Sequence, residues 1–143
     1  MAKIPKDVLE HFRRVPLFEH VSDRGLRAIV SAADEIDEPR GTVLIGEGDL
    51  RRELFVLLTG TAKVTRRGRK IAEVGPGDFF GEIALVSGGP RTATVKAESD
   101  VRVMMLAPAR FETVLDSEPS VRDEVLRALG ERLRSHENTF QAC

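Results

Sequence analysis

The chain has 143 residues, enough for one domain with a substantial core, and its 41% hydrophobic and 31% charged residues are typical of a soluble globular protein. A formal net charge of −1 excludes a strong basic field for nucleic acid or anionic membrane, and no run approaches the ~20 apolar residues of a membrane span. Residues 1–6 lack an apolar signal core and Cys143 is the single cysteine, so we predict a cytoplasmic protein without internal disulfides.

Residues 5–32 are predicted to form a helical lead-in. Pro5 suits a first helical turn, and the apolar residues that follow it recur at helix spacing as far as Phe12. Residues 15–18 interrupt this pattern, and Ser22 is a candidate N-cap for a second helix.

The pattern changes over residues 34–107, where short apolar runs are separated by glycine turns. Many short strands at close spacing favour a sandwich or barrel over a parallel sheet. The basic cluster at 66–70 lacks the nearby aromatic platforms of a nucleic-acid patch, so we interpret it as a solvated hairpin tip. The predicted strands are 42–45, 54–58, 61–65, 71–74, 92–97 and 101–106.

Helical periodicity returns over residues 108–136. Phe111 suits one short helix, and Pro119 begins another, on which apolar residues repeat from Val121 to Leu133. We expect this apolar stripe to pack against the preceding strands.

The segment 79–95 contains the side chains that are best suited to binding a ligand. Glu82 precedes Arg91 by nine positions, and Thr92 follows directly. The Ser-Gly-Gly-Pro run at 87–90 must turn the chain sharply, so the carboxylate and the guanidinium can face one pocket. An ionised carboxylate can accept hydrogen bonds from a sugar hydroxyl, while a guanidinium fork and a hydroxyl can donate to a phosphate.

The backbone of the same segment is also suited to an anion. Small residues at Gly81 and Ala84 let backbone N–H groups approach closely, and a short helical turn starting near Glu82 would point several of them at the ligand. A ligand that carries both ribose and phosphate matches these groups.

At these residues the chain resembles the cyclic-nucleotide-binding domain family. The family's phosphate-binding cassette reads Phe-Gly-Glu-(Ile/Leu)-Ala-Leu, a short spacer, then Arg-(Ser/Thr/Ala)-Ala. Residues 46–49, 54–60 and 75–78 resemble its other recurrent blocks, in the right order. The resemblance implies a mainly β fold, an eight-stranded β-roll with an N-terminal helical segment and two C-terminal helices. Residues 1–143 would then form a single domain. Its parts would be a helical lead-in at 5–32, a β-roll at 34–107 that contains the cassette at 79–93, and lid helices at 108–136.

The resemblance also implies a set of ligand-binding residues. Val64 and Ala72 would line the purine, and Arg132 on the last helix would stack on or cap the base, with Arg134 as the alternative. The last helix would close as a lid. The implied cassette residues are Gly81, Glu82, Ile83, Ala84, Arg91, Thr92 and Ala93.

We therefore expect a sensor module that binds cAMP, with cGMP as the alternative, and that signals to an effector domain or partner protein. The three histidines, His11, His20 and His136, lie outside the roll, and the sequence has no nucleophile elbow or Walker-type loop. We expect no metal, no cofactor, no enzymatic activity and no nucleic acid bound by this domain. A sensor fragment of a DNA-binding regulator and a module that has lost its ligand are the alternatives.

Residues 50–53, Leu-Arg-Arg-Glu, depart from the family pattern, which has a small residue and then an acid or glycine at this place. Because they are far from the cassette in sequence, we expect the departure to affect loop shape rather than ligand class.

Overall fold

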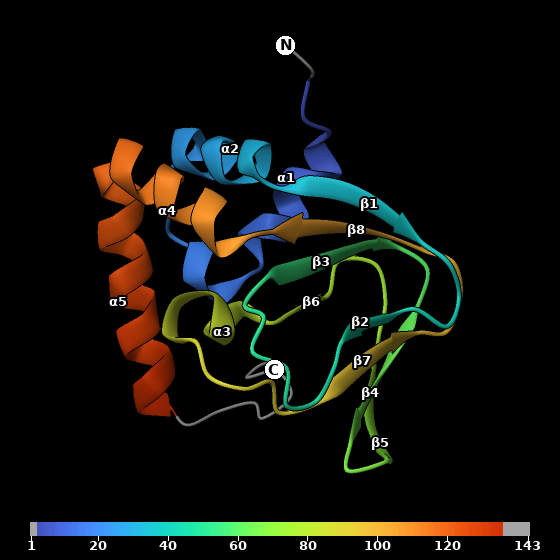
Figure 1. Cartoon of the computed structure of the whole chain (residues 1–143). Helices are drawn as coiled ribbons and strands as arrows, with labels where there is room; N and C mark the ends of the chain where they lie inside the picture. The colour runs from blue at the N-terminus through green and yellow to red at the C-terminus, as the bar shows by residue number, and fades with distance from the viewer. Residues whose placement is uncertain (1–2, 136–143) are drawn as a thin grey trace.

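Two four-stranded antiparallel sheets form the β-roll that the sequence and the resemblance predict. The computed structural model describes residues 3–135 (Figure 1). The first sheet has the order β1-β8-β3-β6, with bounds Asp34–Glu38, Val101–Leu106, Leu54–Thr59 and Phe79–Phe80. The second has the order β2-β7-β4-β5, with bounds Val43–Ile45, Thr94–Ala97, Ala62–Arg66 and Arg69–Val74.

The longer helices gather at one end of the roll (Figure 1). Ser22 is confirmed as an N-cap, because its Oγ accepts the backbone N–H of Gly25 at 3.1 Å. Pro5 is the residue before the first helix rather than part of it. Within residues 3–135, no helix is both long and apolar enough to cross a membrane. The helices are α1 (Lys6–Arg13), η1 (Pro16–Phe18), α2 (Asp23–Ala32), α3 (Glu82–Ser87), α4 (Pro108–Ser117) and α5 (Pro119–Ser135).

Strand β3 separates two apolar cores. Leu54 and Val56 pack in the core that the helices share with the first sheet, whereas Phe55 and Leu57 pack in the core between the two sheets. Side chains alternate along a strand, so a run that is apolar at every position buries both faces. The ring of Phe55 stacks on Phe80 of β6, with centroids 5.3 Å apart, which fixes the strand that leads into the cassette.

Two strands of the roll are not among the six runs predicted from the sequence. Strand β1 is acidic, with Ile36 as its one apolar residue, and it lies at the edge of its sheet. Charges are a common means of protecting such an edge. Asp37 accepts a hydrogen bond from Arg102 Nε at 2.8 Å, and this bond lowers the pKa of the Asp37 carboxyl. The other strand, β6, has two residues, too few to show a period.

Candidate functional site

A left-handed glycine connects strand β6 to helix α3. Gly81 has φ +88°, and a Cβ at this position would lie 2.5 Å from Arg91 Nη1 and 2.7 Å from the carbonyl oxygen of Glu53. Both the backbone angle and the space therefore require glycine. Helix α3 begins at Glu82, as predicted. The sharp turn at 87–90 is also confirmed, with positive φ at both of its glycines.

Arg91 is held in the interior by backbone groups from two other segments. Its side chain is 1% exposed, and Nη2 donates to the carbonyl oxygen of Glu53 at 2.6 Å. Nη1 lies 3.4 Å from the carbonyl oxygen of Gly81. The backbone of Arg91 donates to Asp49 O and accepts from Gly48 N, both at 2.8 Å. The guanidinium is thus fixed from the 48–53 loop and from the start of the cassette.

Glu82 is fully buried, with 0% of the residue exposed. Glu82 and Arg91 are the charged residues that the described part of the chain buries. A surface ion pair, the ordinary structural explanation for such residues, is therefore excluded. Glutamate and arginine are rarely buried unless their charges are satisfied, because moving a charge out of water is costly.

An open hollow lies beside Arg91, with a volume of about 540 Å³. Thr92 is exposed to it, and Arg66 reaches across from the β4–β5 hairpin. Arg66 Nε donates to the carbonyl oxygen of Thr92 at 3.0 Å, and Arg66 Nη2 lies 3.5 Å from the Thr92 hydroxyl. The residues that line the hollow are Glu47, Gly48, Arg66, Arg67, Pro90, Arg91 and Thr92.

The hairpin at 66–70 forms as predicted, with positive φ at Arg67 and Gly68. Residues 67–70 are exposed, which confirms a solvated hairpin tip, and Arg66 and Arg67 also form one wall of the hollow. The sequence did not indicate that these arginines lie near the cassette. They do so because strand β4, which leads into the hairpin, pairs with β7, and β7 begins directly after the cassette.

Val64 and Ala72, predicted to line the purine, lie directly opposite each other on β4 and β5. Val64 and Ala93 are fully buried in the core between the sheets, and Ala72 packs against that core. They share this core with Phe80, the residue before Gly81, but they are not among the residues that line the hollow. Contact with a base stays a prediction for Val64 and Ala72.

The remaining predicted residues belong to α3, within the cassette, and to α5. Ala84 is buried in α3. The side chain of the preceding residue, Ile83, is outside the described part of the structure. Arg132 and Arg134 lie on α5, and their side chains are likewise outside it, so their contact with a base stays a prediction. His136 falls outside the described residues altogether.

Helix α5 runs past α3 (Figure 1), and residues of α3, α4 and α5 line an apolar groove of about 190 Å³. Leu85 of α3 faces Val125 and Leu129 of α5 in this groove. The apolar stripe predicted for the last helix therefore contacts both the helical core and the cassette helix.

The 50–53 loop lies against the cassette although it is far from it in sequence, and the expectation that its departure affects loop shape rather than ligand class stays a prediction. Glu53 supplies the carbonyl that Arg91 binds, and Glu53 Oε1 is 4.0 Å from Arg91 Nη2. Arg51 pairs with the other carboxylate oxygen of Glu53 at 3.3 Å. Arg52 lines the groove beside α3. This loop is part of the support for the site.

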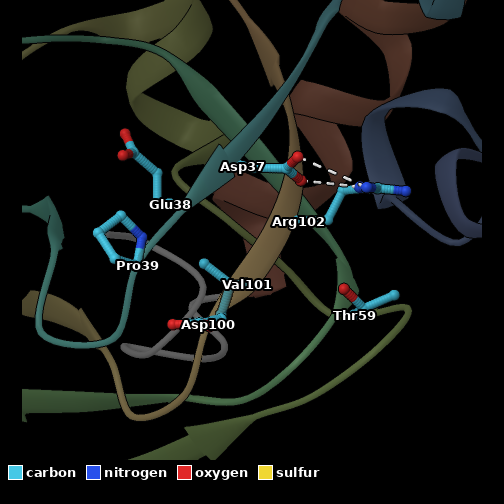
Figure 2. A pocket seen from close by; sticks show the side chains of 7 residues that line it. All are labelled: Asp37, Glu38, Pro39, Thr59, Asp100, Val101 and Arg102. Carbon is cyan, nitrogen blue, oxygen red and sulfur yellow. Dashed lines mark hydrogen bonds and ion pairs between the residues drawn. The ribbon is translucent and has the colours of Figure 1, made fainter.

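A second hollow of about 480 Å³ lies over the edge of the first sheet (Figure 2). Figure 2 shows Asp37 and Arg102 joined across its wall, with Glu38 and Asp100 nearby. Its charged groups come from the edge strand β1, from the residue before β8 and from β8 itself, and none of the predicted ligand residues lies there. Residues 3–135 contain no group of three or more histidine, cysteine, aspartate or glutamate residues that could hold a metal ion.

Two facing antiparallel sheets with helices at one end define the class, a β-roll domain of the jelly-roll type. More particularly, the sequence matches the family described as the cyclic nucleotide-binding domain over residues 37–118, which is more than half of the chain. The protein belongs to that family.

Two relatives illustrate what such domains are joined to. The chain is 28% identical over 136 residues to a CRP-like cAMP-activated global transcriptional regulator of Mycobacterium tuberculosis, covering 92% of this chain and 61% of the regulator. It is 33% identical over 118 residues to a cyclic nucleotide-gated potassium channel of Rhizobium etli, covering 82% of this chain and 33% of the channel. The chain spans less than two thirds of the length of each relative.

Solved structures show the same architecture. The N-terminal domain of a transcriptional regulator from Streptomyces coelicolor A3(2) is 32% identical, with a TM-score of 0.80 over 87% of this chain and 91% of that chain. The regulatory domain of Toxoplasma gondii PKA, solved with cAMP, is 28% identical, with a TM-score of 0.70 over 78% of this chain and 46% of that chain.

Proposed function

We propose that this domain binds cAMP, in preference to cGMP, and acts as a regulatory sensor rather than as an enzyme. The observation that carries the proposal is the burial of two charged residues of the cassette, Glu82 and Arg91, of which Arg91 lies beside an open hollow. Burying two charged groups is costly, and a ligand with a ribose and a phosphate gives both a function. The names of the cAMP-activated regulator and of the PKA structure with cAMP support the same ligand.

Each cassette residue has a chemical role in this proposal. Arg91 would present its guanidinium fork to the cyclic phosphate, and Thr92 would add a hydroxyl donor from the hollow. Glu82, which is acceptor-only when ionised, would accept from a ribose hydroxyl. Val64 and Ala72 would contact the purine from the inter-sheet side, after the cassette has moved to admit it.

Helix α5 would transmit the binding event. Its residues Val125 and Leu129 share a groove with Leu85 of the cassette helix, so a shift of α3 changes the surface on which α5 rests. In the proposed mechanism the ligand stabilises a closed arrangement in which Arg132 caps the base. The ligand can shift this equilibrium only by the difference between its affinities for the two arrangements.

The effector would be a further domain or a partner protein in the cytoplasm. Similarity to the Mycobacterium and Streptomyces regulators favours a transcription regulator, of which this chain would be the sensor part. A reading frame that continues beyond codon 143 into a helix-turn-helix domain would support that candidate, and a stop codon there would support a separate partner.

Ligand class is tested by titration calorimetry of the ligand-stripped chain against cAMP, cGMP and 5′-AMP. We expect saturable binding of both cyclic nucleotides, tightest for cAMP, and far weaker binding of 5′-AMP, whose phosphate carries a second charge and lacks the second ester bond to the 3′-oxygen of the ribose. The proposal fails if neither cyclic nucleotide gives heat or raises the melting temperature at millimolar concentration.

Base preference is tested at Thr92, which could contact either the phosphate or a guanine amino group. Because we assign its hydroxyl to the phosphate, Thr92→Ala should weaken cAMP and cGMP by similar factors, roughly three- to tenfold for one hydrogen bond. Competition binding with the two nucleotides measures both factors in one series. A loss confined to cGMP would assign the hydroxyl to the base and favour cGMP as the ligand.

A further inference from the structure

The side chain of Arg66 contacts Thr92 at two points. Its Nε donates to the Thr92 carbonyl oxygen at 3.0 Å, and its Nη2 lies 3.5 Å from the Thr92 hydroxyl oxygen. Arg66 is the last residue of strand β4, whereas Thr92 directly follows the buried Arg91. Both Arg66 and Thr92 line the hollow that we assign to the ligand.

A threonine hydroxyl has one O–H donor and two lone pairs, whereas a guanidinium has donors only. In the contact with Arg66 the hydroxyl oxygen of Thr92 must therefore accept, which leaves its own proton for another acceptor. Thr92 is exposed to the hollow, so a phosphate oxygen of a bound nucleotide is placed to be that acceptor.

We propose that Arg66 is a positioning residue that determines specificity at the phosphate: it orients the Thr92 hydroxyl toward one of the two exocyclic oxygens of the cyclic phosphate. This inference rests on the proposed function, because it assigns a role within the same site. It adds Arg66, at the end of β4, to the groups proposed to contact the phosphate, which otherwise come from the cassette.

The hairpin is anchored without the Arg66 side chain, so Arg66 is not needed simply to hold it. Glu47 Oε1 accepts the backbone N–H of Arg67 at 3.0 Å, and the backbone N–H of Glu47 donates to Thr94 Oγ1 at 3.0 Å. The backbone pairing of β4 with β5 and with β7 provides further support. Replacing Arg66 should therefore alter the site and leave the fold intact.

Charge alone must be separated from positioning, because any arginine near the hollow attracts an anion. Arg69 provides the matched control. It lies opposite Arg66 in the register of the hairpin and is exposed, but it does not line the hollow. Arg69→Ala removes the same charge from the same hairpin and leaves Thr92 untouched.

The experiment titrates the full chain and its variants with cAMP and with the two phosphorothioate diastereomers of cAMP, each of which replaces one exocyclic oxygen with sulfur. We expect Arg66→Ala to weaken cAMP roughly three- to tenfold and to change the ratio of the two diastereomer affinities by at least about threefold. Arg69→Ala should leave that ratio unchanged. Arg66→Lys should recover part of the cAMP affinity but not the ratio, because an ammonium cannot bridge two oxygens in a plane.

Thr92→Ala tests whether Arg66 acts through the hydroxyl. Once the hydroxyl is gone, adding Arg66→Ala should not change the diastereomer ratio further, as the double-mutant cycle would show. The proposal is overturned if Arg66→Ala changes the diastereomer ratio equally in the wild-type and Thr92→Ala backgrounds. It is also overturned if folded Arg66→Ala keeps the wild-type diastereomer ratio. If the wild-type chain binds none of the three ligands, the proposed function itself fails, and the inference falls with it.

Discussion

Arg91→Ala should lower the affinity for cAMP by roughly 30-fold to a few thousandfold. Removing one partner of a buried, hydrogen-bonded charge pair costs about 2–5 kcal/mol of binding free energy, because the other charge is left buried and unpaired. The side chain of Arg91 is 1% exposed, so water cannot replace it next to the phosphate. Calorimetric titration with cAMP measures the effect directly.

The same substitution should also lower the free energy of unfolding. Arg91 donates to the carbonyl oxygens of Glu53 and Gly81. The Gly81 oxygen keeps a bond from the backbone N–H of Leu85, but the Glu53 oxygen loses its Arg91 donor, and a buried carbonyl left without a donor costs about 1–3 kcal/mol. Binding must therefore be measured at a temperature where circular dichroism shows the variant to be folded. Arg91→Lys should recover part of the affinity, because it restores the charge but not the fork.

Arg102→Ala is the control for loss of an arginine in general. Arg102 is bonded to Asp37 at the second hollow, away from every predicted ligand residue, so cAMP affinity should stay at the wild-type value. Glu82→Ala should cost less than Arg91→Ala, about 1.5–3 kcal/mol, because a ribose hydroxyl is neutral. A folded Arg91→Ala variant that binds cAMP within about threefold of wild type would show the phosphate assignment to be wrong.

Much of the fold follows from periodicity in the sequence. The run at 54–58 is apolar at every position because β3 buries both faces, and both the strand and its buried character were predictable. Strand β1 was not, because Asp34, Glu35 and Asp37 give it the composition of a loop. Its stability comes from pairing with β8 and from Arg102, which are contacts between residues far apart in sequence.

The site likewise has residues that the sequence identifies and supporting contacts that it does not. Glu82 and Arg91 were identifiable, because residue type and spacing are local properties of the cassette. The supporting contacts from Glu53 and Arg66 were not, since they depend on how the 50–53 loop and the β4–β5 hairpin fold back over residues 91–92. Sequence distance carries no information about such contacts unless the strand register is known.

The second large effect is expected at Gly81, where Ala should abolish detectable cAMP binding. With φ at +88°, any side chain strains the backbone, and the added Cβ would press on Arg91 Nη1 at 2.5 Å and on the Glu53 carbonyl oxygen at 2.7 Å. Relief of these contacts must move either the guanidinium or the loop that holds it. If the Arg91 guanidinium is displaced, the variant also loses binding free energy from its contact with the phosphate, in addition to the energetic cost of the strained backbone.

Gly60→Ala is the control that distinguishes the effect of backbone strain from the effect of disrupting the ligand site. Gly60 also has a positive φ, +87°, and an added Cβ would clash with the backbone oxygen of Asp100, but Gly60 lies in the turn between β3 and β4, away from the cassette. Strain of this kind costs about 1–3 kcal/mol, so both variants should melt several degrees below wild type. Below the melting transition, Gly60→Ala should bind cAMP with wild-type affinity, whereas Gly81→Ala should not bind it measurably. Equal affinities in the two folded variants would mean that the geometry around Gly81 and Arg91 does not form the phosphate site.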